Sequence, residues 1–125
     1  MLADKNAMAT IAVKDLDAAR AFYGDTLGLT PTGARSNEVA LFRSGGTTIV
    51  VYRSELAGTN KATVATWGVG NELEAVVAAL SEAGVRFEHY DFPGAQRDGD
   101  VHVFGDFRGA WFKDPDGNIL HVNNG

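Results

Sequence analysis

The same order of secondary-structure signals runs twice through this chain, and the repeat limits the folds open to it. In the first half, alternation at 9–13 predicts a strand, and apolar residues three and four apart over 16–27 predict an amphipathic helix. In the second half, a strand signal at 63–69 precedes a helix signal at 72–83. The valines that end the two strands, Val13 and Val69, are 56 residues apart. We therefore expect two similar units in tandem.

Three further strand signals follow each helix. In the first half they lie at 32–35, 39–43 and 47–52, and in the second at 85–90, 109–113 and 118–123. The last two flank the tight turn Asp114–Gly117. The pattern predicts one α+β domain over 1–125, made of two tandem βαβββ modules at about 7–53 and 62–123 with a linker at 54–61. Each module has one face without a helix, so we expect a curved mixed sheet around a cleft.

Charge and composition exclude several classes of function. The 125 residues include 11 Lys and Arg against 16 Asp and Glu, which gives a net charge of −5. This surplus of acid argues against a nucleic-acid or anionic-membrane partner. The absence of cysteine excludes disulfides and thiolate chemistry. No apolar run is long enough for a signal peptide or a membrane span, so we expect a cytoplasmic protein.

Strand alternation predicts which side chains face the cleft. They are Met8, Thr10, Val64, Thr66, Trp111, Ile119 and His121. Trp111 offers a stacking surface for a planar ligand, or else forms a hydrophobic wall or a dimer contact. His121 is the candidate catalytic residue, as a hydrogen-bond donor or general base with a pKa near neutrality. The alternative for His121 is an imidazole bonded to Asn123 or water.

Two motifs resemble those of a known superfamily. The segments 11–16, 21–23 and 27–29 resemble the first half of vicinal-oxygen-chelate proteins, the group of glyoxalases, bleomycin-resistance proteins and extradiol dioxygenases. The segment Phe112–Asn118 resembles the second-half signature, a turn before the final strand. The resemblance implies paired βαβββ modules around a concave cleft, often in homodimers. It does not imply one reaction, because the superfamily hosts lyases, isomerases, dioxygenases, thiol transferases and drug-sequestering proteins.

The resemblance also implies where metal ligands would stand. The four positions correspond to Met8, Val64, Val50 or Val51, and His121. Three of the four are apolar: a Met thioether is a poor donor to hard divalent ions, and a Val side chain donates nothing. We therefore expect no metal and no cofactor. A different site made of His89, His102 and His121 remains a less favoured alternative.

The longest irregular segment lies at 92–107. Its Asp98-Gly99 pair is a hairpin signal, so we expect residues 97–101 to form a β-finger. The segment is either a lid that places Phe104 and Phe107 over the cleft or an additional edge hairpin.

These observations favour a metal-free protein that sequesters an apolar or aromatic organic ligand, such as a natural product or an antibiotic. The alternative is an enzyme of the same superfamily, a lyase, isomerase or dioxygenase, that uses His121 or an unrecognised metal site. A third hypothesis is a structural or regulatory dimer with a vestigial cleft. A homodimer is expected in each case, since monomers rarely expose an apolar cleft.

Overall fold

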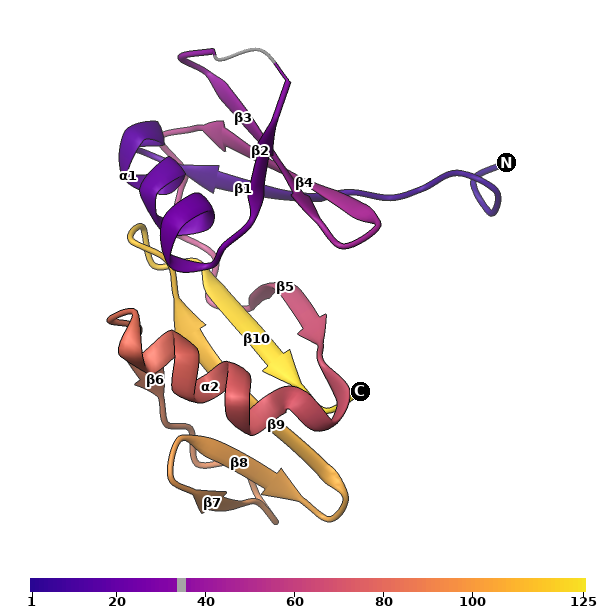
Figure 1. Ribbon diagram of the computed structural model, residues 1–125, viewed down its shortest axis with the longest axis vertical. Helices are drawn as coiled ribbons and strands as arrows, with labels where there is room; N and C mark the ends of the chain where they lie inside the picture. The colour runs from indigo at the N-terminus through magenta and orange to yellow at the C-terminus, as the bar shows by residue number, and fades with distance from the viewer. Residues whose placement is uncertain (34–35) are drawn as a thin grey trace.

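Two βαβββ modules lie next to each other in the computed structural model, which describes residues 1–33 and 36–125 (Figure 1). The first contains β1 (Ala9–Val13), α1 (Leu16–Arg20), the π-helical turn η1 (Ala21–Thr26), β2 (Thr30–Thr32), β3 (Val39–Ser44) and β4 (Thr47–Arg53). The second contains β5 (Thr63–Gly68), the 3-10 turn η2 (Gly70–Glu72), α2 (Leu73–Glu82), β6 (Phe87–Glu88), β7 (Gln96–Asp98), β8 (Val101–Phe104), β9 (Phe107–Lys113) and β10 (Ile119–Asn123).

The strands pair as two sheets, and in this the fold differs from the single curved sheet expected. The first sheet has the order β1-β4-β3-β2, and the second has the order β5-β10-β9-β8-β7, with β6 also paired to β9. β1 and β5 each pair in parallel with the last strand of their own module, which makes them edge strands that lie near each other. The α+β class and the two-module architecture are confirmed.

The bounds of several elements differ from those predicted. The strand expected at 32–35 is β2, which ends at Thr32, and residues 34–35 lie outside the described part of the chain. The strand expected at 85–90 is reduced to the two residues of β6. The predicted finger at 97–101 is the turn of the β7–β8 hairpin, which extends the second sheet beyond β9 instead of projecting from it.

The first helix begins where the sequence predicts. Asp15 is its N-cap, because a carboxylate oxygen accepts a hydrogen bond from the backbone N–H of Ala18 at 3.1 Å. α1 continues directly into η1, and this continuous helix buries Leu16, Ala19 and Tyr23 against the first sheet. Gly28 follows with a φ of 75°, a conformation that glycine adopts at little cost at the end of a helix.

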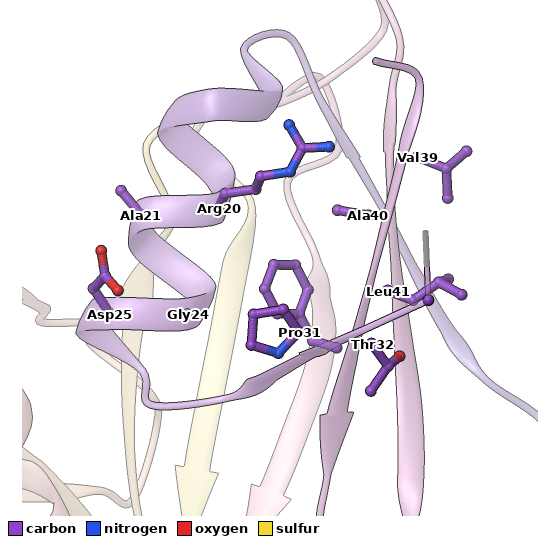
Figure 2. Close-up of a pocket in the computed structure, with 11 residues that line it drawn as sticks. Arg20, Ala21, Gly24, Asp25, Pro31, Thr32, Val39, Ala40 and Leu41 are labelled. Atoms are coloured by element: carbon purple, nitrogen blue, oxygen red, sulfur yellow. The ribbon is translucent and has the colours of Figure 1, made fainter. Parts of the chain in front are cut away.

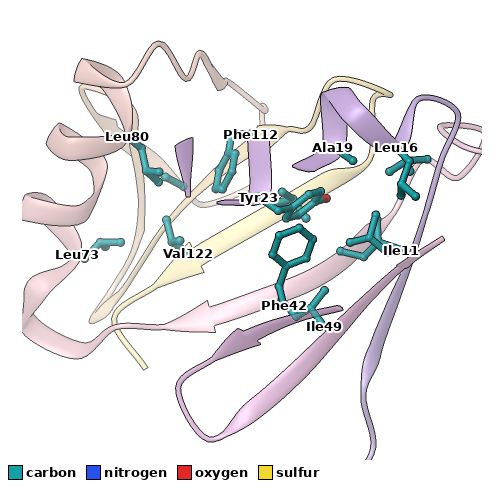
Figure 3. Packing of buried hydrophobic residues seen from close by; sticks show 14 of the residues in the cluster. Ile11, Leu16, Ala19, Tyr23, Phe42, Ile49, Leu73, Leu80, Phe112 and Val122 are labelled. Carbon is teal, nitrogen blue, oxygen red and sulfur yellow. The ribbon is translucent and has the colours of Figure 1, made fainter. Parts of the chain in front are cut away.

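One hydrophobic core extends under the helices of both modules (Figure 3). In the first module, Ile11, Val13 and Phe42 are almost fully buried. In the second, Phe112 and Leu120 are equally buried, as alternation in the last two strands predicts. The opposite face of each sheet carries no helix and is left for a site.

The turn after β9 joins the two modules. The buried Asp114 carboxylate accepts a hydrogen bond from the Tyr23 hydroxyl at 2.8 Å. The side-chain amide of Asn118 donates to the Ala12 carbonyl at 2.7 Å, and the backbone N–H of Lys14 donates to Asp116 at 3.0 Å. Burial, together with the Asp114 charge, raises the pKa of Tyr23 far above its ordinary value, so its hydroxyl remains a donor.

Across the described residues, no helix combines the length and the apolar character that crossing a membrane requires.

Candidate functional site

The uncovered side of the second sheet carries a continuous group of aromatic rings, which we call the aromatic face. It consists of Tyr90, Phe92, His102, Phe104, Phe107, Trp111 and His121. β9 and β10 place Trp111 directly opposite His121, and β8 and β9 place His102 opposite Gly109, two residues from Trp111. Because side chains alternate along a strand, all three rings project to the side away from α2.

Trp111 lies at the centre of the aromatic face, between two imidazoles. Its ring stacks on that of His121 with centroids 4.0 Å apart and an angle of 16° between the planes. The His102 ring meets Trp111 edge-on at 5.1 Å. Offset stacks and edge-on contacts are the favourable arrangements of aromatic rings. The indole is therefore held in one orientation by the rings around it, including those of Tyr90 and Phe92, and it remains partly exposed.

His121 is buried, although the sequence pattern predicts an open cleft position. Its side chain is only 6 % exposed, and Nδ1 lies 3.0 Å from the Ala110 carbonyl oxygen. A carbonyl only accepts, so Nδ1 carries the proton and Nε2 keeps a lone pair. Burial lowers the pKa of His121 below its ordinary value of 6.5 despite this hydrogen bond. The imidazole is therefore neutral near pH 7.

Gly109 makes room for His121. A Cβ at this position would lie 2.5 Å from Cε1 of His121 and 3.3 Å from a ring carbon of Phe107. Real Cβ atoms essentially never make the shorter of these contacts. The absence of a side chain at Gly109 is thus a condition for the Trp111–His121 stack.

His102 is even more deeply buried, at 1 % exposed. Its Nε2 accepts a hydrogen bond from the backbone N–H of Tyr90 at 2.9 Å, so Nδ1 carries the proton. In the described structure neither Nδ1 of His102 nor the buried Tyr90 hydroxyl has a hydrogen-bond partner. Burial lowers the pKa of His102, against the influence of nearby Gly109 and Tyr90 backbone groups.

A cavity of about 420 Å³ lies against the aromatic face. Its lining residues are Lys61, Ala62, Thr63, Tyr90, Phe92, Trp111 and Ile119. Phe92 and Phe107 at the margin of the face are 37 % and 40 % exposed. An apolar concave surface with a few polar groups is typical of a small-molecule site.

The residues predicted to line the cleft are only partly brought together. Trp111 and Ile119 line the same cavity, and Thr66 lies opposite His121 in the register of β5 and β10. Val64 falls at the bulge in that register, where Ile119 pairs with Thr63 and Leu120 with Ala65. It is partly buried against the core.

Thr10 belongs to β1 of the other sheet, and Met8 lies just before that strand. Both are exposed, Met8 to 55 %, and neither is among the residues that line the cavity beside Trp111. Within one chain, none of the described residues of the first module therefore lines that cavity.

Tyr90 and Phe92, which help to build the aromatic face, were not predicted to belong to the site, and His102 was predicted there only in the three-histidine alternative. Tyr90 and Phe92 lie in the irregular segment after β6, whose path depends on its docking against β9. The alternation of Val101 to Phe104 was the available signal for His102, because it places His102 and Phe104 on one face.

The 92–107 segment is a structural part of the face. Phe104 contacts Phe92 and Phe107 with ring centroids 5.5 and 5.9 Å apart. These rings extend the wall around Trp111, and the β7–β8 hairpin forms an edge of the second sheet, as the edge-hairpin alternative expects.

The donor set does not fit the divalent metal of metal-dependent relatives. Met8, Val64 and Val50 carry no nitrogen or oxygen donor, and the Nδ1 of His121 is bound to Ala110. Trp111 stands between His102 and His121, which prevents the three histidines from converging. The described residues contain no group of three or more His, Asp or Glu side chains that could hold an ion.

A second cavity, of about 380 Å³, lies between the first helix and the strands β2 and β3 (Figure 2). Arg20 projects into it from the helix, and Pro31 and Leu41 line its other side. None of the predicted site residues lines this cavity.

Two βαβββ modules, each with a bare concave face, define the class of vicinal-oxygen-chelate folds. The sequence model of the Glyoxalase/Bleomycin resistance protein/Dioxygenase superfamily matches residues 6–122, and the chain belongs to this superfamily. No curated protein sequence matches it.

Solved structures share the fold at low sequence identity. The bleomycin-binding protein of Streptomyces verticillus, complexed with copper(II)-bleomycin, is 23 % identical, with a TM-score of 0.74 over 100 % of this chain and 99 % of that one. The fosfomycin resistance protein FosX of Listeria monocytogenes is 17 % identical, with a TM-score of 0.74 over 99 % and 95 %. Lactoylglutathione lyase of Agrobacterium tumefaciens is 18 % identical, with a TM-score of 0.71 over 97 % and 94 %.

Proposed function

We propose that this protein binds a planar aromatic organic molecule, such as a natural product or an antibiotic, on the aromatic face, and that it does so without a metal. The observation that carries the proposal is the position of Trp111, which is stacked on His121 and also lines the cavity of about 420 Å³. A pre-oriented indole binds a flat ring at little entropic cost.

The aromatic face favours binding over chemistry. Both buried imidazoles have a lowered pKa and are held by backbone hydrogen bonds. Such groups give directional contacts to a ligand: Nε2 of His121 as an acceptor, and Nδ1 of His102 as a donor if the ligand reaches it. Binding is also what the name of the Streptomyces relative, a bleomycin-binding protein, states for that protein.

A fluorescence titration tests the proposal. The chain contains two tryptophans, so Trp67→Phe leaves Trp111 as the reporter. We expect bleomycin, or another member of a panel of planar aromatic natural products, to change Trp111 emission in a saturable way. Trp111→Ala should weaken binding by about 1–3 kcal/mol, through the loss of stacking and buried area. Equal affinity of Trp111→Ala and the parent for every bound ligand would refute the proposal.

The metal content of the protein tests the proposal that it binds its ligand without a metal. The purified protein should hold no stoichiometric Mn, Fe, Ni, Cu or Zn, and a chelator should leave ligand affinity unchanged. One equivalent of tightly bound metal per chain would overturn the metal-free assignment and favour an enzyme.

We also propose that the site is completed in a homodimer. On the first sheet, Val39 and Tyr52 project from the face opposite the core and are 36 % and 38 % exposed, and Met8, just before β1, is 55 % exposed. A second copy would cover this apolar face together with the aromatic face, whose Phe92 and Phe107 are also exposed.

A second candidate function rests on the unpaired Nε2 of His121. A neutral imidazole in apolar surroundings can accept a proton from a substrate, as a lyase or isomerase requires. Turnover that disappears in His121→Gln, while ligand affinity is retained, would favour this candidate over sequestration.

A further inference from the structure

A cavity of about 150 Å³ lies between the two modules, on the side of the helices; we call it the seam cavity. The first module contributes Leu27 and Leu29, which follow η1, and the second contributes Trp67, Val76, Leu80 and Phe112. In Figure 3, Leu80 on α2 lies beside Phe112 of the second sheet. The cavity is thus built by residues that approach each other only when the modules pack.

The lining of the seam cavity is almost entirely hydrocarbon. Ser44 supplies the single hydroxyl of the lining, and its oxygen accepts a hydrogen bond from the indole Nε1–H of Trp67 at 2.9 Å. No charged side chain among residues 1–33 and 36–125 lines the cavity. Such a wall offers little to water, which needs two to four polar partners, and it favours an uncharged apolar occupant.

The size of the cavity limits what it can hold. The cavity opens to solvent between side chains that are only partly buried, among them Leu27, Leu29 and Val76. An engineered apolar cavity of roughly 150 Å³ stays dry and binds benzene. The matching occupant is one small ring, far below the size of a natural product.

The seam cavity is separate from the aromatic face. Trp67 pairs with Val122 in the sheet register, whereas Trp111 pairs with His121, so the two tryptophans project to opposite sides of the second sheet. A ligand in one cavity contacts none of the side chains that line the other.

We propose that the seam cavity is a second binding site, which takes a small uncharged aromatic molecule of the size of benzene or toluene. The occupant contacts both modules at once and therefore stabilises their packing. This site does not depend on the function proposed for the aromatic face.

Toluene is the probe for this test. In Trp111→Phe, Trp67 is the remaining tryptophan and lies in the wall of the seam cavity. We expect toluene to change Trp67 emission in a saturable way and to raise the melting temperature with toluene concentration, because a ligand that binds only the folded state stabilises it. Emission that does not saturate, or an unchanged melting temperature, would overturn the proposal.

Matched variants on α2 locate the site. Val76→Phe fills the cavity from the helix and should abolish both toluene effects, whereas Ala79→Phe adds the same ring on the exposed side of the helix and should preserve them. If Val76→Phe does not fold, methyl NMR of the parent chain decides. Toluene should then shift the methyl signals of Val76, Leu80 and Val122 and leave that of Ile119, at the aromatic face, in place. Shifts confined to Ile119 would contradict the proposal.

Discussion

His121 differs most from its expected environment. Alternation along the last strand predicts its side correctly, but not its burial, because the sequence does not reveal that Trp111 and Phe107 cover the ring. A residue can therefore face a site and still support the fold. Removal of the His121 side chain should therefore affect the stability of the protein.

His121→Ala should destabilise the protein by about 1–2 kcal/mol, through the loss of the indole stack and of the bond to Ala110. Leu120→Ala should cost more, about 2–5 kcal/mol, because Leu120 is fully buried in the core. Urea unfolding of both variants checks the order. A harmless Leu120→Ala beside an unfolded His121→Ala would mean that the strand register is shifted by one residue.

Gly109 offers a more selective test of the same stack. Gly109→Ala should displace His121, since the added methyl group would meet its ring. We expect reduced ligand affinity together with altered Trp111 emission. Gly46→Ala is the control, since a Cβ there meets nothing within 4 Å. Equal effects of the two substitutions on affinity would contradict the role assigned to Gly109.

The buried histidines predict how stability depends on pH. Burial lowers the pKa of both His102 and His121 in the folded state, so the unfolded chain binds protons more readily as pH falls through 6.5. The contribution of the two neutral imidazoles to the stability of the folded state is therefore fully present above pH 6.5 and is lost progressively below it.

The melting temperature should fall between about pH 7.5 and 5.5, and the slope should be smaller in His102→Gln. Thermal melts of parent and variant at matched ionic strength measure both slopes. A melting temperature that rises as the solution is acidified would contradict the assignment of neutral, buried imidazoles.

At the scale of elements, the turn after β9 is central to the module contact. Asp114 accepts hydrogen bonds from Tyr23, from the backbone of Asp116 and from the backbone and side chain of Asn118. Asp116 makes one bond to the other module, from the Lys14 N–H. The turn is predicted well from sequence, but its role as a clamp is visible only in three dimensions.

Asp114→Asn should lower the free energy of unfolding by at least about 2 kcal/mol, because several buried donors lose a charged acceptor. Asp116→Asn, the matched control two residues away, should cost less than about 1 kcal/mol. Chemical denaturation of the two variants measures the difference between their free energies of unfolding. Comparable losses would show that the buried carboxylate is not what holds the modules.

The elements that sequence predicts best are those whose signals are local. β1 and the long helix follow from periodicity and from the Asp15 cap, and the Asp98-Gly99 turn follows from its residue types. The division into two sheets could not be predicted from the sequence, because it depends on which strand edges come together in the folded chain. For the same reason, the course of 89–95 and the ring of Tyr90 against Trp111 could not be predicted.

For the whole molecule, the homodimer is the testable expectation. Light scattering at micromolar concentration should give about twice the chain mass of 13.3 kDa. Tyr52→Glu places a charge on the exposed apolar face of the first sheet and should shift the mass toward that of one chain, whereas Glu55→Gln, in the linker, should not. A parent protein that scatters as a single chain would refute the dimer.

The seam between β1 and β5 has a consequence for how copies of this chain can assemble. In the described part of the chain, neither strand is paired with the other sheet, so the modules are joined by side chains, by a few turn contacts and by the linker. Separating them breaks no backbone ladder within either sheet. The modules of two chains could therefore be exchanged, each re-forming the same clamp with its counterpart in the other copy. Such domain swapping would preserve the core of each module pair, while it alters which faces of the two chains come into contact.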